Sequence, residues 1–402
     1  MRASWLAPTL LVVWCGIAGA GTEWLDRVPS VQRGLFRADL SGLLDVEGYY
    51  IDQRPPGLIF GGDASFVNPR LSLFLDTRFG RHLYGFVQAR LDRGFDPRER
   101  RVAAHVDEYL VRYTPGETPV VNLQFGKFAT IVGSWVSRHD SWNNPFVNAP
   151  LPYENVTIVS GTMAPAGPAA FLARRQLPDR KRAWVPIIWG PDYTSGGAVF
   201  GRITDFEYAV EVKNAALASR PVAWNPVNRG WDDPTTSARV GWHPRAAWTF
   251  GTSFSTGPYL YEDAIATLPR GQGLGDFRQW LVGADASWAW RHVQVWGEFF
   301  ATRFEVPRVG DADSAAYYLE GRYKLTTALY GALRWNQQFF GDVPDGHGGD
   351  VAWDRDIWRV DAAVGYRLNR HLQTKLQYAY SHQQGRLQQG EQLVAAQVTL
   401  KF

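Results

Sequence analysis

Hydrophobicity alternates with a period of two along most of this 402-residue chain. The closing segment QLVAAQVTLKF (392–402) shows the pattern, because apolar residues occupy every second position and Gln397, Thr399 and Lys401 lie between them. Successive side chains of a β-strand point to opposite sides, so this pattern predicts a strand with one apolar and one polar face. Outside the apolar N-terminal stretch, we find no helical periodicity of comparable strength.

The same alternation recurs along the chain, and the connections alternate between short turns and longer loops rich in Gly, Pro and Asp. The expected strands cover 37–51, 66–79, 82–92, 104–114, 119–129, 195–203, 205–214, 236–244, 246–256, 277–291, 293–304, 315–325, 327–339, 355–368, 370–383 and 391–402. An even strand count with short turns on one side and long loops on the other is typical of membrane barrels. The predicted fold is therefore all-β: a transmembrane antiparallel β-barrel of about 16 strands over residues 37–402, with its apolar face toward lipid.

Residues 1–20 have the features of a signal peptide. Arg2 precedes an apolar stretch that is too short for a membrane helix, and small residues lead to a cleavage site after Ala20. We expect residues 21–36 to form a periplasmic segment ahead of the first strand. Cleavage also removes Cys15, the only cysteine, so the mature chain has no disulfide and no thiol chemistry.

Composition argues against several classes of function. A net charge of +3 over 402 residues leaves no electrostatic footprint for nucleic acid. The eight histidines are scattered, without the spacing of a catalytic triad, and no pattern of metal ligands occurs. We therefore expect no enzyme activity, no metal and no cofactor. The 18 Trp and 17 Tyr suit the aromatic girdles of a membrane barrel.

Across its whole mature length, the chain resembles the sixteen-stranded porins of Gram-negative bacteria. Within LQFGKFATIVGSW, the element Gly126-Lys127-Phe128 is similar to one that precedes the third loop of the phosphate-selective porins. The lysine cluster that gives that family its name has no counterpart here, so phosphate selectivity is not carried over. The aromatic last residue, Phe402, resembles the assembly signal of outer-membrane proteins. The resemblance implies an outer-membrane location, contact with lipid and lipopolysaccharide, recognition by the barrel-assembly machinery and a homotrimer as one arrangement.

Residues 130–194 form the third and longest connection of the expected barrel. A loop of this length is normally functional or disordered, and here aromatic residues and prolines indicate order. The resemblance implies that it folds inward and narrows the lumen. A lid over the mouth is an alternative, and an additional strand pair within the loop would give 18 strands. The aromatic candidates for contact with solutes are Trp135, Trp142, Tyr153 and Trp184.

The candidate selectivity residues are basic. The loop segment ARRQLPDRKR (173–182) contains five cations and one acid, and cations in a narrow passage attract anions. The alternative is a solvated or lipopolysaccharide-facing surface run. The candidates are Arg138, Arg174, Arg175, Arg180, Lys181 and Arg182 on the loop, and Arg78, Arg90 and Arg112 on the wall.

The sequence thus predicts an outer-membrane porin, a water-filled channel for passive diffusion of small hydrophilic solutes. Charges of both signs on the expected lumen face need water around them, which favours an open channel over a plugged barrel. An anion preference is the sharper hypothesis. The alternatives are a channel specific for sugars or aromatic acids, motivated by the loop tryptophans, and a non-conducting structural or adhesin barrel.

Overall fold

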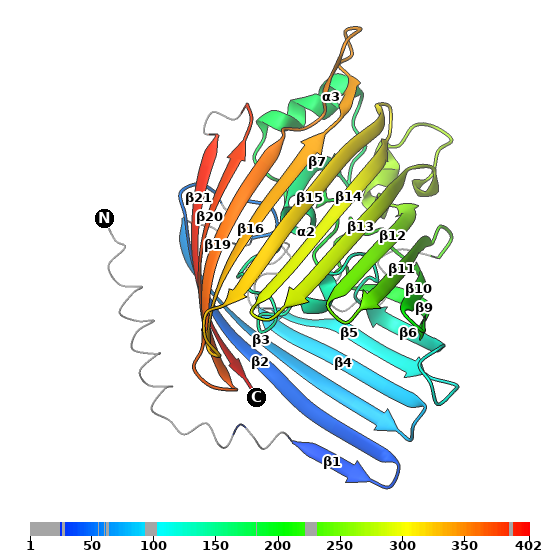
Figure 1. Cartoon of the computed structure of the whole chain (residues 1–402). Coiled ribbons are helices and arrows are strands. Elements are labelled where there is room, and N and C mark those ends of the chain that lie inside the picture. The colour runs from blue at the N-terminus through cyan, green and yellow to red at the C-terminus, as the bar shows by residue number, and fades with distance from the viewer. Residues whose placement is uncertain are drawn as a thin grey trace.

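A closed antiparallel barrel makes up most of the protein (Figure 1). The computed structural model describes residues 25, 29–54, 56–59, 61, 64–92, 103–181, 183–221, 231–385 and 389–402, so the expected signal peptide lies outside the described residues. The barrel strands are β2 (Phe36–Ile51), β3 (Ser65–Phe79), β4 (Leu83–Asp92), β5 (Ala103–Tyr113), β6 (Asn122–Phe128), β9 (Thr194–Ile203), β10 (Phe206–Lys213), β11 (Thr235–Arg245), β12 (Trp248–Pro258), β13 (Arg278–Trp290), β14 (Val293–Val306), β15 (Gly310–Lys324), β16 (Leu329–Phe340), β19 (Ile357–Arg367), β20 (Leu372–Gln383) and β21 (Gly390–Lys401).

These sixteen strands confirm the expected fold and strand positions, and each pairs with its neighbours in chain order. A seventeenth strand of the sheet, β1 (Ser30–Arg33), lies within the expected N-terminal segment and pairs only with β2. Within the third loop, β7 (Val156–Ser160) and β8 (Trp184–Pro186) pair with each other and not with the barrel. The alternative of 18 barrel strands is therefore wrong.

The barrel closes where β21 pairs with β2. The register runs from Leu43 opposite Lys401 to Ile51 opposite Leu393. One residue further, Gly42 and Phe402 exchange backbone hydrogen bonds of 2.8 and 3.0 Å. Closure leaves none of the sixteen described barrel strands with an unpaired edge, and an apolar environment requires this.

The alternation of long and short connections holds for every pair of strands except β14 and β15. Only residues 307–309 join them, whereas the sequence predicts a longer gap over 305–314. The two strands extend toward each other as far as the pair Val306–Gly310, and Arg308 takes a positive φ of 61° to complete a tight turn. The polar residues Asp311 and Asp313 thus belong to a strand and not to a loop.

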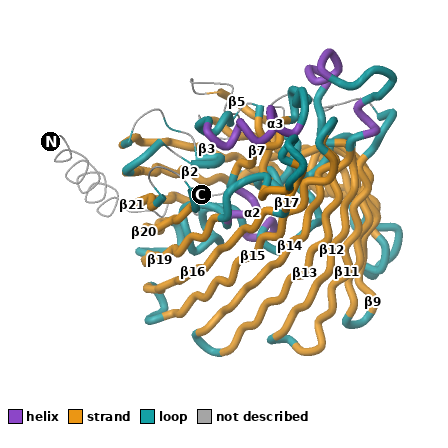
Figure 2. The backbone as a smooth tube through the Cα atoms, turned by 90° about the horizontal axis from the view of Figure 1, so that it is seen from above, coloured by secondary structure: helices purple, strands orange, loops and turns teal. Residues whose placement is uncertain are grey.

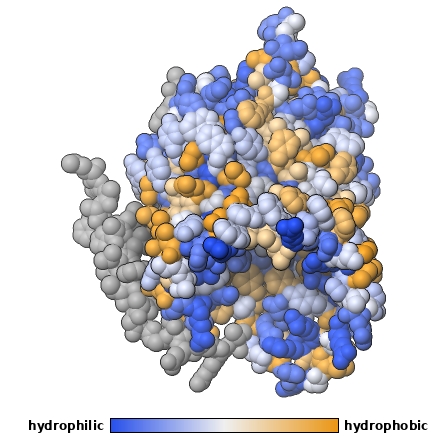
Figure 3. Space-filling view, viewed as in Figure 1, coloured by the Kyte–Doolittle hydropathy of each residue, from blue (hydrophilic) through white to orange (hydrophobic). Residues whose placement is uncertain are grey.

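Side chains on the barrel strands alternate as the sequence predicts. On β19, Val360 and Val364 face outward, while Arg359 and Asp361 face the lumen and are buried there. Figure 3 shows apolar residues over the middle of the visible wall, with more hydrophilic residues toward its two ends. This apolar band is the surface that a bilayer covers.

The other elements are short and lie in the connections. They are η2 (Val136–Arg138), α2 (Leu151–Glu154), α3 (Pro168–Leu172), η3 (Ala173–Gln176), η4 (Glu262–Thr267), η5 (Leu274–Asp276) and the paired strands β17 (Asp342–Pro344) and β18 (Asp350–Ala352). Among the described residues, no helix is long and apolar enough to cross a membrane. Seen from above, α2 and β7 lie inside the ring of strands (Figure 2).

Candidate pore and its third loop

The third loop, residues 129–193 between β6 and β9, enters the barrel and packs against the lumen side of one part of the wall. Trp135 and Tyr153 of the loop form an apolar cluster with Leu281, Phe300 and Tyr318, which belong to β13, β14 and β15. The Tyr153 ring meets the Phe300 ring edge-on at 5.8 Å, and both are buried. This side of the barrel interior is therefore packed as the core of a soluble protein is.

Glu298 on β14 anchors the start of the loop. Its carboxylate accepts hydrogen bonds from the backbone N–H and hydroxyl of Ser134, from the Trp135 N–H at 2.8 Å and from the Tyr153 hydroxyl at 2.6 Å. A carboxylate can accept several donors at once, and hydrogen bonds to a charged acceptor are the stronger kind. One wall residue thus fixes two separate turns of the loop.

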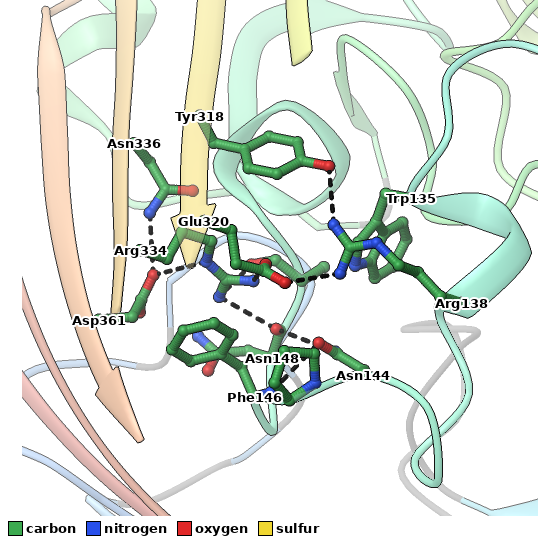
Figure 4. Close-up of polar contacts among 12 residues, drawn as sticks. Trp135, Arg138, Asn144, Phe146, Asn148, Tyr318, Glu320, Arg334, Asn336 and Asp361 are labelled. Atoms are coloured by element: carbon green, nitrogen blue, oxygen red, sulfur yellow. Dashed lines mark hydrogen bonds and ion pairs between the residues drawn. The ribbon is translucent and has the colours of Figure 1, made fainter. Parts of the chain in front are cut away.

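Next to this anchor, arginines and carboxylates of loop and wall alternate in a buried network (Figure 4). Arg138 of the loop pairs with Glu320 of β15 at 2.6 Å. Glu320 lies 3.5 Å from Arg334 of β16, which pairs with Asp361 of β19 at 2.8 Å. Arg334 also donates to the carbonyl of Asn148 at 3.1 Å. The wall arginine therefore binds wall carboxylates and loop backbone together.

Two further wall residues continue this contact toward β20. Arg359 pairs with Glu154 of α2 at 2.7 Å. The Lys375 amine donates to the carbonyls of Ser141, Asn144 and Phe146 at 2.8, 3.0 and 3.0 Å. Buried charges are costly unless they are paired and hydrogen-bonded, and here the loop backbone supplies the missing partners. Residues 134–154 of the loop therefore lie within the barrel, so the lid alternative is wrong for them, whereas α3 of the same loop lies at the long-loop end (Figure 1).

The opposite side of the lumen, next to β2–β5, contains open space. A cavity of about 400 Å³ lies between these strands and loop residues 139–143, and a second one of about 170 Å³ adjoins it. The two cavities share Arg70, Arg90, His139 and Ser141 in their linings. A third, of about 30 Å³, shares Glu154 with the second. Together they mark a polar path past the loop.

Paired charges line this path. Arg70 of β3 lies 3.2 Å from Asp45 and 2.6 Å from Glu47, both on β2. Arg90 of β4 lies 3.0 Å from Asp92 and forms a second ion pair across to β5. Positive and negative groups thus lie within a few ångströms of each other along the wall.

A β-bulge brings a further carboxylate to the path. The register between β4 and β5 shifts at Gln88, so that Glu108 pairs with Gln88 and Asp107 has no partner in the ladder. Both carboxylates then face the lumen: Asp107 contacts Arg90 at 3.3 Å, and Glu108 accepts from the Ala129 N–H of the loop at 3.1 Å. An inserted residue that re-aims a side chain is a common use of a bulge.

His139 joins the two ends of the loop where the two larger cavities meet. Its Nδ1 lies 2.5 Å from the Val136 carbonyl and its Nε2 lies 2.7 Å from the Tyr193 hydroxyl. A carbonyl can only accept, so Nδ1 carries the proton and the tyrosine hydroxyl donates to Nε2. Burial lowers the pKa of His139 from its usual value, which favours this neutral form.

The basic candidates predicted from the sequence are dispersed over the barrel. Arg138 is buried in the network described above, whereas Arg174 donates to the carbonyls of Ile158 and Met163. Arg175 donates to the Ala352 carbonyl at 2.8 Å, Lys181 donates to the Ile59 carbonyl at 2.6 Å, Arg180 is exposed, and Arg182 lies outside the described residues.

On the wall, Arg90 lines both larger cavities, as expected. Arg112 lies nearer the short-turn end of the barrel, 4.9 Å from the Phe200 ring, and Arg78 is exposed beside the turn that follows β3. Sequence reasoning missed Arg70, the other arginine of the cavities. The alternation of β3 would have found it, because Arg70 and Arg78 have the same parity.

Of the four loop aromatics, three are packing residues. Trp135, Tyr153 and Trp184 are buried in apolar clusters. Trp142 is half-buried and lines the larger cavity, with the Arg367 guanidinium 5.1 Å from its ring. In the described part of the chain, no three His, Cys, Asp or Glu side chains form a group that could hold a metal ion.

Comparisons with known proteins add information on the fold. No model of a protein family matches the chain, and no curated relative is found. Among solved structures, it is similar to OmpT, an outer membrane protein of Vibrio cholerae (TM-score 0.56, 10% identity, 93% of this chain and 100% of that one). It is also similar to the anion-selective porin from Comamonas acidovorans (TM-score 0.57, 10% identity, 91% of this chain and 100% of that one). A third similar structure is the outer membrane channel DcaP of Acinetobacter baumannii (TM-score 0.55, 10% identity, 92% of this chain and 99% of that one).

At about one identical residue in ten, these likenesses show a shared fold, the sixteen-stranded barrel of the outer-membrane porins. The apolar outer wall supplies an independent physical argument, because a closed barrel with such a wall suits a bilayer and not water. Together, fold and surface place the chain in the bacterial outer membrane.

Proposed function

We propose that this protein is a channel for passive diffusion of small hydrophilic solutes across the outer membrane. The observation that carries the proposal is the one-sided attachment of the third loop. Most of its described wall anchors lie on β10–β20, from Glu211 to Lys375, whereas the connected polar cavities lie along β2–β5. The loop thus narrows the lumen from one side and leaves a path on the other.

The lining of this path supports transport of hydrated solutes. The half-buried Arg70 offers donors that water or a polar solute can use, while Arg90 and the carboxylate partners of both arginines are buried beside it. The smallest of these three cavities, about 30 Å³, is lined by Glu154, Asp179 and Arg359 among others. We therefore propose that solutes cross the narrowest part between α2 and the wall.

The finer proposal is an anion preference set at the long-loop entrance. Arg175 and Arg180 lie in the loop segment that the sequence singles out, and Arg180 is exposed there, so both can raise the local concentration of anions. The carboxylates around Arg70 and Arg90 act in the opposite direction. The ratio of anion to cation permeability measures which group has the larger effect.

A planar bilayer experiment tests both levels. Purified protein should give stable conductance steps in potassium chloride, and a salt gradient should give a reversal potential on the anion side. The variant Arg175→Gln/Arg180→Gln should move that potential toward the cation side. An unchanged potential would contradict the anion preference but not the channel. A protein that inserts as a folded barrel and never conducts would refute the channel and support a non-conducting structural barrel.

The other parts of the proposal concern export and assembly. They are removal of residues 1–20, docking of the Phe402 strand on the assembly machinery, contact with lipopolysaccharide and a homotrimer. One solved structure of the similar OmpT is a trimer form, which supports the last of these. N-terminal sequencing of the mature protein and light scattering in detergent test the first and the last directly. The protein acts as a channel without enzymatic turnover in this proposal.

A further inference from the structure

Three aromatic rings line the lumen side of β3 and β4 beside the larger cavity. Phe74 and Phe86 are 6.3 Å apart between ring centroids and 16° from parallel, and Phe86 and Tyr84 are 6.5 Å apart and 13° from parallel. All three occupy lumen-facing positions, because they share strand parity with Asp76 and Arg90. We call Phe74, Phe86 and Tyr84 the aromatic row.

The aromatic row packs against other residues on one side and remains partly exposed to the lumen on the other. Phe86 and Tyr84 rest against a small buried cluster of Leu110, Phe128 and Ala198. All three rings of the row are only half-buried, and Phe74 and Phe86 belong to the lining of the cavity of about 400 Å³. None of the loop anchors uses them. Apolar ring surface is thus presented to the lumen at a fixed place.

The loop faces the aromatic row across the same cavity with a ring of its own. Trp142 lines the cavity together with Ser141 and Asn143. This turn is rigid, because the Asp140 carboxylate accepts from the backbone N–H groups of Trp142 and Asn143 at 2.8 and 2.9 Å. A flat solute in the cavity therefore has an aromatic ring available on each of two sides.

The polar groups of the cavity favour a neutral solute. Each of the two arginines in its lining is paired with two carboxylates, so an ion of either sign meets attraction and repulsion within a short distance. A hydroxyl group, in contrast, both donates and accepts, and the Gln88 amide and the Ser72 hydroxyl offer the same double capacity.

From this arrangement we propose that the larger cavity is a binding site for neutral sugars. The C–H face of a sugar ring would lie on Phe74 or Phe86, and its hydroxyls would exchange hydrogen bonds with the Gln88 amide and accept them from Arg70. The volume of about 400 Å³ lies within the range of small-molecule sites, roughly 300–1,000 Å³. This inference rests on the proposed channel function and names its substrate class.

Further aromatic contacts extend from the row toward the short-turn end. The Arg112 guanidinium lies 5.4 Å from the Tyr84 ring and 4.9 Å from the Phe200 ring, so these side chains continue the aromatic row in space. A sugar that leaves Phe86 meets Tyr84 next, and then the Arg112 plane. Consecutive contacts of similar strength keep the solute bound weakly enough to move on, which conduction requires.

Single-channel current tests the site, with glucose and sucrose as probes. Each sugar should lower the open-channel current in a saturable manner. Phe74→Ala and Phe86→Ala should each raise the half-saturating sugar concentration about threefold to tenfold, as expected for loss of one aromatic contact. The matched control is Phe299→Ala, because Phe299 lies on β14, faces lipid and is 46% exposed. It should leave the sugar block unchanged.

Two outcomes would overturn the sugar site while the channel itself stands, because salt conductance is measured on the same pores. One is a sugar block that is absent or does not saturate. The other is equal weakening by Phe299→Ala. Phe74→Leu, which keeps apolar volume but removes the ring, covers the case in which the alanine variants fail to assemble. A stronger block by benzoate than by glucose would also contradict the neutral class.

Discussion

Replacement of Arg334 by methionine is the sharpest test of how the third loop is held. The side chain is 0% exposed and lies between Asp361 at 2.8 Å and Glu320 at 3.5 Å. It also donates to the carbonyls of Asn148 and Ala149 at 3.1 and 3.2 Å. Methionine has similar length and no charge, so Arg334→Met leaves two buried carboxylates and two carbonyls without this partner.

The expected loss of stability is large because the site is dry. Removal of one partner from a buried ion pair costs about 3–5 kcal/mol, since the remaining charge stays buried. The matched control is Arg303→Met. Arg303 also binds two carboxylates, Asp311 at 2.8 Å and Asp313 at 2.7 Å, but its side chain is 47% exposed on the outer wall. Solvent screens such a pair, so the control should cost about 0–1 kcal/mol.

Denaturant titration in lipid vesicles measures both free energies of unfolding, and a bilayer recording measures the pore. Arg334→Met should lose about 2–3 kcal/mol more than Arg303→Met, because the first ion pair is buried and the second is half exposed to solvent. Its open-channel current should also become larger or noisier, because Asn148 and Ala149 each lose one of their contacts with the wall. Equal losses in the two variants, with unchanged current, would refute the view that buried pairing holds the loop.

Three further changes probe other features. Gly126→Ala should block assembly of the barrel, measured as loss of the heat-resistant folded band on gels. Gly126 has φ 137°, and a Cβ there would lie 2.1 Å from the Tyr109 carbonyl oxygen. The control Gly321→Ala should assemble normally, because its Cβ would meet no atom within 4 Å. Glu298→Gln should cost about 1–3 kcal/mol in denaturant titrations, because the amide replaces one acceptor by a donor opposite loop N–H groups. Burial lowers the pKa of Lys181 from 10.5 to about 8, so between these values the unfolded chain binds more protons than the folded one, and stability should rise with pH across that window. Lys181→Met should reduce this increase; an equal pH slope in the variant would contradict the assignment.

The strands could be predicted from sequence because the barrel imposes one rule on every strand. A lipid-facing position must be apolar and a lumen-facing one need not be, so parity alone places Val364 outside and Asp361 inside. The rule fails where the backbone departs from regular pairing. At the bulge beside Gln88, parity changes within β5, and no local pattern announces that Asp107 and Glu108 both face the lumen.

The candidate site was harder to predict, because a charge in the sequence does not show what satisfies it. Arg174 and Lys181 look like free cations in the string ARRQLPDRKR. In the structure, Arg174 donates to backbone carbonyls earlier in the same loop, and Lys181 donates to the Ile59 carbonyl in another loop. Arg70 has no basic neighbours in sequence, yet it lies in both cavities. Prediction of these positions requires the path of the loop, which depends on contacts across the whole barrel.

The attachment of the third loop has a consequence for the order of folding. The bond from Tyr153 to Glu298 joins residues 145 positions apart, and that from Lys375 to Ser141 joins residues 234 positions apart. The loop is therefore synthesised and exported long before the strands that hold it. Contacts of such high sequence separation form slowly, so the polar groups of the loop stay hydrated until β14–β20 are in place. Docking of the loop and completion of the wall therefore occur together, late in folding. A chain arrested before β20 would have neither a docked loop nor a closed barrel.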